Sequence, residues 1–346
     1  MLERVPENPI LKLRSDHPWE SHYVFNPAAL YLDGKVHLIY RAIGQSGLSV
    51  FGYASSSDGI HFDERPDEPV YLCAGPQPCK KKRSRYAYAS GGSWSGCEDP
   101  RLTQIGDTIY MTYTAFNGWG SSAPGVVLTS ISVDDFLHKR WDWQSPRLLS
   151  PPNEMHKNWV IFPEKIKEKL AVLHSITPDV LIDYFDDFEG DDKYVKSHYC
   201  SKGREAHWDN WVRGVGPPPI KTKEGWLVLY HAMDTRDPNR YKLGAMILDT
   251  HDPTKIVRRC SFPLLEPDAR YENIGFKPGV IYACGAVVIG EKLFVYYGGA
   301  DTVVCAATTN LQELLRELPH VTLPQKKLAS KLNWFSRLIQ FLKGLK

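Results

Sequence analysis

The 346-residue sequence predicts an all-β protein, a five-bladed β-propeller followed by a short C-terminal amphipathic helix. Three observations predict this fold: a composition suited to strands and turns, one strand pattern that occurs five times, and helical apolar spacing in the tail. Aromatic residues make up 12% of the chain, which also holds 26 Gly and 25 Pro. Such a composition favours many short strands joined by tight turns.

The repeated pattern is a strand, a polar turn, and a second strand that ends in aromatic residues. It occurs at ALYLDGKVHLIYRA (29–42), PRLTQIGDTIYMTYTAF (100–116), FPEKIKEKLAVLHSI (162–176), PIKTKEGWLVLYHAM (219–233) and GAVVIGEKLFVYYGGAD (285–301). Successive segments start 71, 62, 57 and 66 residues apart, which leaves room for about four strands in each unit. Five such units predict a propeller over residues 1–318. Two packed sheets are the alternative, but they would not explain the repeat.

The tail, residues 319–346, is predicted to form a basic amphipathic helix. Apolar residues recur at helical spacing through KKLASKLNWFSRLIQFLKGLK (326–346), and no acidic residue follows Glu317. A helix of this kind can lie on an anionic membrane surface or dock on a second subunit. Packing on its own propeller is an equal alternative, and the sequence leaves all three open.

Charge and cysteine content narrow the possible partners and the compartment. The 42 basic and 40 acidic residues give a formal charge of only +2, so nothing favours a nucleic-acid ligand. The seven cysteines are odd in number, scattered, and never spaced as C-x-x-C. We therefore expect reduced thiols, no metal, and a cytoplasmic protein, peripheral at a membrane only if the tail binds one. No signal peptide or long apolar span is recognisable.

Polar residues that end or precede the repeated strands are the candidate functional residues. They are Asn26, Arg41, Asp99, Lys165, His231 and Asp301. Taken singly, each has a structural explanation: Asp99 before Pro100 can cap a turn, and His231 can be a hydrogen-bonded core histidine. Because the inner strands of a propeller converge on its axis, their shared place in the repeat favours one common ligand site.

Eight short motifs, in order, resemble glycoside hydrolase family 130, the β-mannoside phosphorylases and mannosidases. They are FNPAAL, DGKVHLIYRA, SSSDGIHF, GCEDPRLT, FPEKI, GWLVLYHA, PLLEPD with YENIGF, and GGAD, and they span roughly residues 6–315. The resemblance implies a five-bladed propeller, in agreement with the repeat count. It also implies an enzyme that cleaves β-mannosidic bonds of manno-oligosaccharides with inversion.

The resemblance assigns roles to particular residues. Asp99 of the EDPR motif matches the general acid, which in the phosphorylases passes its proton through a sugar hydroxyl. Asn26, Arg41 and Asp58 match positions that hold the mannosyl unit, and Asp301 of GGAD matches a further site position. Amide, guanidinium and carboxylate groups suit this task, because each forms paired hydrogen bonds with neighbouring hydroxyls.

The phosphate site of the family phosphorylases is altered in this sequence. Their two arginines fall here at Lys157 and Ser175, and their lysine falls at Val212 or Arg213; only the histidine, His231, is kept. Charge-assisted bonds contribute roughly 1.5 to 3 kcal/mol each, so losing two guanidinium groups weakens phosphate binding if nothing replaces them. Hydrolysis by a β-mannosidase is therefore the leading hypothesis.

Two alternatives accompany that hypothesis. The first is a phosphorylase that uses inorganic phosphate as co-substrate and binds it through Lys157, Arg213 and His231, with Lys165 as a further candidate. The second is a non-catalytic glycan-binding propeller, against which the retained Asp99 argues.

A hydrolase also needs a general base opposite Asp99. Glu272 of YENIGF and Glu164 of FPEK are best placed by repeat position, with Glu205 third. Glu164 can instead pair with Lys165 as a structural link.

Overall fold

The structure of the protein, a computed structural model, describes residues 1–73, 95–116, 123–188 and 194–321. The predicted helix at residues 326–346 lies outside these residues. Within them the protein is nearly all β, with three short helices: α1 (Val133–Leu137), α2 (Arg270–Asn273) and α3 (Leu311–Glu317). None of these helices is long and apolar enough to span a membrane.

The N-terminal half of the chain forms one seven-stranded sheet made of two antiparallel groups. The first group contains β2 (Tyr23–Leu32), β3 (Lys35–Ile43) and β4 (Leu48–Ser56). The second contains β5 (Ser95–Ile105), β6 (Thr108–Phe116), β7 (Gly125–Ser132) and β8 (Arg147–Leu148). Among the described residues, the backbone pairing between the two groups is that of β4 with β5, which pair in parallel at Leu48 with Ser95 and at Ser49 with Gly96.

The C-terminal half forms three further antiparallel sheets. One contains β9 (Val160–Ile161), β10 (Leu170–Ile176) and β11 (Val180–Phe185). The next contains β12 (Trp211–Val215), β13 (Ile220–Thr222), β14 (Gly225–Asp234), β15 (Asp237–Leu248) and β16 (Ile256–Arg259). The last contains β17 (Ile281–Ile289), β18 (Lys292–Gly299), β19 (Val303–Asn310) and the N-terminal β1 (Glu3–Arg4).

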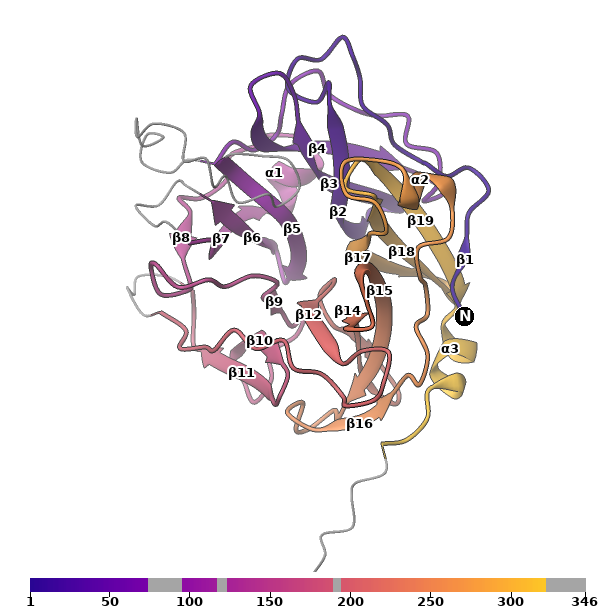
Figure 1. The fold of residues 1–346 in the computed structure, drawn as a ribbon. Coiled ribbons are helices and arrows are strands. Elements are labelled where there is room, and N and C mark those ends of the chain that lie inside the picture. Colours follow the sequence, from indigo (N-terminus) through magenta and orange to yellow (C-terminus); the bar gives the residue numbers. More distant parts are fainter. Residues whose placement is uncertain (74–94, 117–122, 189–193, 322–346) are drawn as a thin grey trace, which may run out of the picture.

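Each of the five repeated sequence segments contributes to a hairpin in one of these groups; in the third, the first strand, β9, ends at Ile161, directly before the segment begins. The hairpins are β2–β3, β5–β6, β9–β10, β13–β14 and β17–β18. The five groups follow one another around a common centre, which β5, β9, β12 and β17 border (Figure 1). The described strands form four separate sheets rather than one closed sheet.

Apolar side chains fill the spaces between successive groups of strands. One buried cluster joins β3 to β5, β6 and β7, and another joins β7 to β9 and β10. The largest cluster runs from β10 through β14 and β15 to β17, β18 and β19. A further cluster joins the last group to the first. It contains Phe294 and Tyr296 of β18 together with Leu38 of β3. Every group of strands is thus held by the one before it and the one after it.

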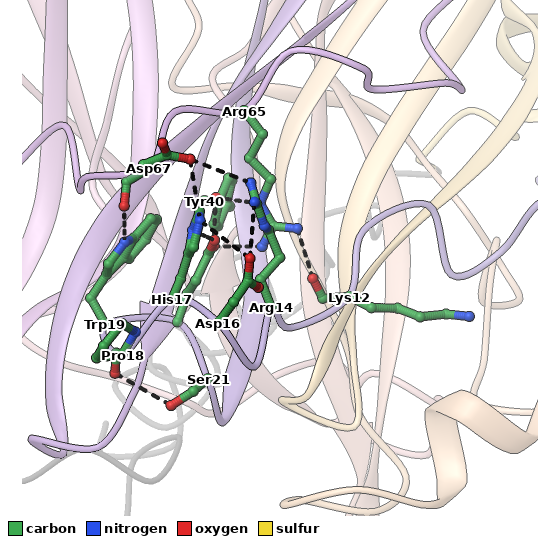
Figure 2. Close-up of polar contacts among 11 residues, drawn as sticks. Lys12, Arg14, Asp16, His17, Pro18, Trp19, Ser21, Tyr40, Arg65 and Asp67 are labelled. Carbon is green, nitrogen blue, oxygen red and sulfur yellow. Dashed lines mark hydrogen bonds and ion pairs between the residues drawn. The ribbon is translucent and has the colours of Figure 1, made fainter.

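A polar network behind β3 fixes the N-terminal segment against the first group (Figure 2). The buried Glu20 carboxylate accepts hydrogen bonds from Tyr40 Oη at 2.7 Å and from Arg65, and it contacts His17 Nδ1 at 2.8 Å. The Arg65 guanidinium also lies 5.1 Å from the centre of the Tyr40 ring. Neighbouring side chains of a strand point to opposite faces, so anchoring Tyr40 here directs Arg41 to the other side of β3.

The N-terminal strand is bound into the last sheet by a buried ion pair. Strand β1 pairs with β19, with Arg4 opposite Ala307. Arg4 Nε and Nη2 each lie 2.8 Å from a different oxygen of the buried Glu272 carboxylate. That carboxylate also accepts hydrogen bonds from Tyr297 Oη at 2.8 Å and from two backbone N–H groups that precede α2. Glu272 therefore connects the start of the chain to its last sheet.

Removing this carboxylate should destabilise the fold. Glu272→Ala leaves Arg4 and the Tyr297 hydroxyl without a buried partner, so we expect the free energy of unfolding to fall by about 3 kcal/mol or more. Denaturant unfolding followed by circular dichroism measures this change.

Glu164→Ala is the matched control, since its carboxylate is half exposed and pairs with the exposed Lys221. Loss of an exposed ion pair should change stability by no more than about 1 kcal/mol. Equal effects of the two substitutions would show that Glu272 does not hold the N-terminal strand.

Candidate active site

A cavity of about 220 Å³, the central cavity, collects side chains from distant parts of the chain. It is lined by Asn26, Arg41, Asp99, Lys157, Asn158, Tyr199, Arg213, Tyr241, Lys277, Val280, Tyr282 and Asp301. Six of the residues predicted from the sequence are among them: Asn26, Arg41, Asp99, Lys157, Arg213 and Asp301. The structure thus brings together Asp99, three of the four predicted sugar-binding residues and two of the predicted phosphate-binding residues.

Three of the polar residues in the central cavity have unusual backbone conformations. Asn26, Asp99 and Asp301 have φ values of 48°, 53° and 50°, in the left-handed region that most residues avoid and that Asn and Asp tolerate best. The strand register shifts at Asn26 and again between Glu98 and Arg101. Such bulges re-aim side chains next to active sites. At Asp99 the bulge lets two consecutive carboxylates, Glu98 and Asp99, reach the same arginine.

Arg41 links these carboxylates. Its Nη1 donates to Asp99 Oδ1 at 3.2 Å, its Nη2 donates to Glu98 Oε1 at 2.9 Å, and its Nε donates to Ser49 Oγ at 2.8 Å. Asn26 Nδ2 donates to the same Asp99 oxygen at 2.9 Å. Asp99 is only 5% exposed. Burial opposes its ionisation, but the positive charges of Arg41, Arg101 and Lys157 prevail and lower the pKa of Asp99.

Arg101 and Asn158 form a hydrogen-bonded network that supports the backbone next to the site. The buried Arg101 guanidinium donates to the Asp99 carbonyl oxygen at 2.7 Å and to Asn158 Oδ1 at 2.8 Å. Asn158 also accepts from Tyr282 Oη at 2.6 Å and donates to the Arg213 carbonyl oxygen at 2.7 Å. Sequence reasoning missed all three supporting residues. A signal existed for two of them, because Arg101 completes EDPR and Asn158 follows Lys157.

Asp301 is a second carboxylate in the central cavity, and its environment differs from that of Asp99. Burial and the negative charges of Asp99 and Glu98 raise the pKa of Asp301 to about 6, although Lys277 and Arg41 act in the opposite direction. Asp301 therefore titrates near neutrality, whereas Asp99 is stabilised in its ionised form. Among the residues that line the cavity, these are the two carboxylates.

A smaller second cavity, of about 30 Å³, shares Lys157, Asn158, Tyr199 and Arg213 with the central cavity. Lys157 Nζ donates to Glu98 Oε2 at 3.2 Å. The Arg213 guanidinium lies 5.2 Å from the Trp211 ring and 5.4 Å from the Tyr241 ring, and is thereby held between them. Two cations thus stand where the cavities meet.

The second cavity also shows what replaces the second arginine of the family phosphorylases. Ser175 lines it, and its hydroxyl donates to the Thr177 carbonyl oxygen at 2.9 Å.

His231 lies outside the lining of both cavities. Its Nε2 accepts a hydrogen bond from the Ala283 backbone N–H at 2.8 Å, and its ring stacks on Tyr282 with centroids 4.1 Å apart. Burial lowers the pKa of His231 to about 3, so the ring is neutral at pH 7. In this structure His231 supports the Tyr282 wall of the central cavity.

Two predicted site residues belong to turns instead. The half-exposed Asp58 carboxylate accepts from the backbone N–H groups of Ile60 and His61, each at 2.8 Å, and contacts the His61 ring. It therefore stabilises its own turn in SSSDGIHF. Lys165 is exposed in the turn between β9 and β10. Neither residue lines the central cavity or the second cavity.

The three glutamates predicted as general bases also lie elsewhere. Glu272 is fully occupied by Arg4, Tyr297 and two backbone N–H groups. Glu164 pairs with Lys221 at the surface, rather than with Lys165, and Glu205 is exposed. None of them lines either cavity. In the described residues, no group of three His, Cys, Asp or Glu side chains is arranged to bind a metal ion.

Comparison with known proteins places this site in a family. A family model described as β-1,4-mannooligosaccharide phosphorylase, that of glycoside hydrolase family 130, matches residues 1–319. The chain belongs to glycoside hydrolase family 130. This result confirms the resemblance inferred from the ordered motifs and, with it, the prediction of a carbohydrate-active enzyme.

Relatives within family 130 support the same assignment. The 1,2-β-oligomannan phosphorylase of Thermoanaerobacter sp. (strain X514) is 36% identical over 321 residues, which cover 90% of this chain and 98% of the relative. A solved β-1,2-mannobiose phosphorylase from Listeria innocua superposes with a TM-score of 0.68 at 26% identity, covering 92% of this chain and 99% of that one.

A further solved structure is described with family 130 glycoside hydrolases that target β-1,2-mannosidic linkages in Candida mannan. It has a TM-score of 0.69 at 26% identity and covers 90% of this chain and 94% of that one. Family 130 therefore includes both reaction types, so the family alone does not decide between them.

Gly298 should be essential for the geometry of the acid. A Cβ at this position would lie 2.0 Å from Asn26 Oδ1, so Gly298→Ala must displace Asn26 and break its bond to Asp99. We expect at least a tenfold loss of kcat on a β-mannoside, since a misplaced acid can lose about two orders of magnitude in rate. Steady-state kinetics measures the loss.

Gly290→Ala is the control in the same hairpin. Gly290 has a φ of 61° and nothing within 4 Å of an added Cβ, so alanine should cost about 1 kcal/mol of stability through backbone strain alone. Its kcat should stay close to that of the unaltered protein. If Gly298→Ala also keeps its kcat, Asn26 does not position Asp99.

Asp301→Asn should stabilise the protein at alkaline pH. Because the folded pKa of about 6 exceeds the ordinary value of 3.8, ionising Asp301 destabilises the fold at pH values above 6, and this effect disappears below 3.8. The substitution should therefore raise the free energy of unfolding by about 2 to 3 kcal/mol at pH 8 and by little at pH 4. Denaturant unfolding at the two pH values tests this, and a stabilisation independent of pH would contradict it.

Proposed function

We propose that the protein is an inverting β-mannoside phosphorylase, which transfers the terminal mannosyl unit of a manno-oligosaccharide to inorganic phosphate. The observation that carries the proposal is the pair of cations, Lys157 and Arg213, at the junction of the two cavities, beside the Asp99 end of the central cavity. Mannose 1-phosphate and a shortened oligosaccharide are the products. Phosphate is the co-substrate, and no other cofactor is needed.

The acid half of the reaction uses the groups around Asp99. Asn26 and Arg41 fix the Asp99 carboxyl group and can also hold the hydroxyls of the mannosyl unit. In the mechanism implied by the family, Asp99 donates its proton through a sugar hydroxyl to the glycosidic oxygen. The bond to the leaving sugar then breaks as the nucleophile attacks the opposite face of the ring.

The charged groups at the junction of the two cavities favour phosphate over water as the nucleophile. Charge-assisted hydrogen bonds contribute roughly 1.5 to 3 kcal/mol each, so an ammonium and a guanidinium can replace much of the binding that the altered arginines would provide. Hydrolysis, the leading hypothesis from the sequence, requires a base opposite Asp99, and all three candidate glutamates lie outside the cavities. Two relatives from Thermoanaerobacter sp. (strain X514), 36% and 34% identical to this chain, are also named as phosphorylases.

We also propose that the five groups of strands are the blades of a β-propeller. Five antiparallel groups in sequence order around one centre, with β1 completing the last group, are the arrangement expected of that architecture. The cytoplasmic location and the role of the tail stay predictions.

Product analysis tests the proposed reaction directly. The full chain is incubated with β-1,2- or β-1,4-mannobiose, each with and without inorganic phosphate, and sugars are separated by anion-exchange chromatography. We expect mannose 1-phosphate and mannose only when phosphate is present. Equal release of mannose without phosphate would instead establish a hydrolase, and no turnover of any manno-oligosaccharide would favour a binding protein.

Substitution of the two cations should weaken phosphate binding specifically. Lys157→Met and Arg213→Met each remove one charged donor, which corresponds to at least a tenfold rise in the KM for phosphate. The control is Lys165→Met, since Lys165 is exposed and outside both cavities. If all three variants keep the phosphate KM of the unaltered protein, phosphate does not bind at the junction of the cavities.

A further inference from the structure

Glu98 bridges the two halves of the site. It is completely buried, and its two oxygens bind different cations: Oε1 accepts from Arg41 Nη2 at 2.9 Å and Oε2 accepts from Lys157 Nζ at 3.2 Å. Arg41 belongs to the sugar side of the central cavity, whereas Lys157 stands at its junction with the second cavity. The side chain that follows it in the chain is the acid, Asp99.

The position of Glu98 matters for whether Asp99 can be protonated. An acid must carry a proton before it can donate one, yet Asp99 is surrounded by cations. An opposite charge within about 4 to 6 Å can lower a carboxyl pKa by 1 to 3 units. Arg41, Arg101 and Lys157 all act on Asp99 in this direction. Two of these three cations are the ones that Glu98 binds.

Most other groups near Asp99 are cationic or neutral. The ionisable side chains that act on it or share its cavity are Arg41, Arg101, Lys157, Arg213, Lys277, Asp301, His231, Tyr199, Tyr241, Tyr282 and Cys284. His231, Tyr282 and Cys284 are neutral at pH 7, because burial lowers the pKa of His231 and raises those of Tyr282 and Cys284. Asp301 is the other carboxylate that lines the cavity; its charge also acts on Arg41, but less strongly than that of Glu98.

We propose that Glu98 is a positioning residue that pairs with Arg41 and Lys157 at the same time and thereby allows Asp99 to hold the proton it donates. Glu98 itself lines neither cavity and would act through the two cations. The inference rests on the proposed function only in taking Asp99 as the acid. It holds for either nucleophile, water or phosphate.

The pH dependence of kcat/KM distinguishes this role from a merely structural one. Glu98→Gln keeps the shape of the side chain but removes its charge, so the cations act fully on Asp99 and its proton is lost at lower pH. The alkaline limb of the kcat/KM profile for β-mannobiose should move down by about one pH unit or more, and activity on that limb should fall at least tenfold. Activity should recover as the pH is lowered.

Lys157→Met should shift the alkaline limb of the kcat/KM profile in the opposite direction. Removing this cation takes away one of the positive charges that lower the pKa of Asp99, so the alkaline limb should move to higher pH. This variant also keeps the test decisive if Glu98→Gln fails to fold, which thermal unfolding would reveal.

Ser49→Ala is the matched neutral control, since it removes the 2.8 Å hydrogen bond from Arg41 Nε without changing any charge. It should lower the rate without moving the limb. The proposal is overturned if Glu98→Gln lowers activity equally at every pH, or if Lys157→Met leaves the limb in place. Products are identified in the same assays, so a mannose-only product would refute phosphorolysis without affecting the comparison of limbs.

Discussion

The burial of one guanidinium group governs the architecture of the site. Arg41 is 1% exposed, and a charge removed from water in this way is tolerated only when it is paired and hydrogen-bonded. Its partners, Ser49 on β4 and Glu98 and Asp99 on β5, come from two neighbouring groups of strands. Because the same arginine is anchored through Tyr40 on the opposite face of β3, the acid is held by the framework of the fold rather than by a loop.

Local sequence patterns predicted the arrangement of strands well. Alternating apolar residues and turn signals identify hairpins without knowledge of distant partners, so all five repeated segments were found. Asp99, the proposed acid, followed from a motif, as did Asn26, Arg41 and Asp301. The three candidate bases lie outside both cavities, which motif order could not show because it does not reveal where a side chain points. Glu272 binds Arg4, 268 residues away, and no pattern around Glu272 indicates that partner.

The preference for hydrolysis failed for a related reason. Counting lost arginines assumed that their places would stay empty, but Arg213 reaches the junction of the cavities where the register of β12 shifts between Val212 and Gly214. A bulge of this kind turns one residue out of the regular alternation of a strand. Nothing in VRGVG distinguishes the bulged residue in advance, so the sequence left Val212 and Arg213 as equal alternatives.

The pairing of β1 with β19 also constrains the order in which the protein folds. Asn8 Nδ2 donates to the Ala306 carbonyl oxygen at 2.7 Å although 298 positions separate the two residues. Contacts this distant in sequence form late, since a long loop must close first. Asn26 and Asp301 likewise meet in one cavity only after the ring of strand groups is complete. A chain without β17, β18 and β19 would therefore contain Asp99 but not the complete central cavity, so the site depends on strands far from it in the sequence.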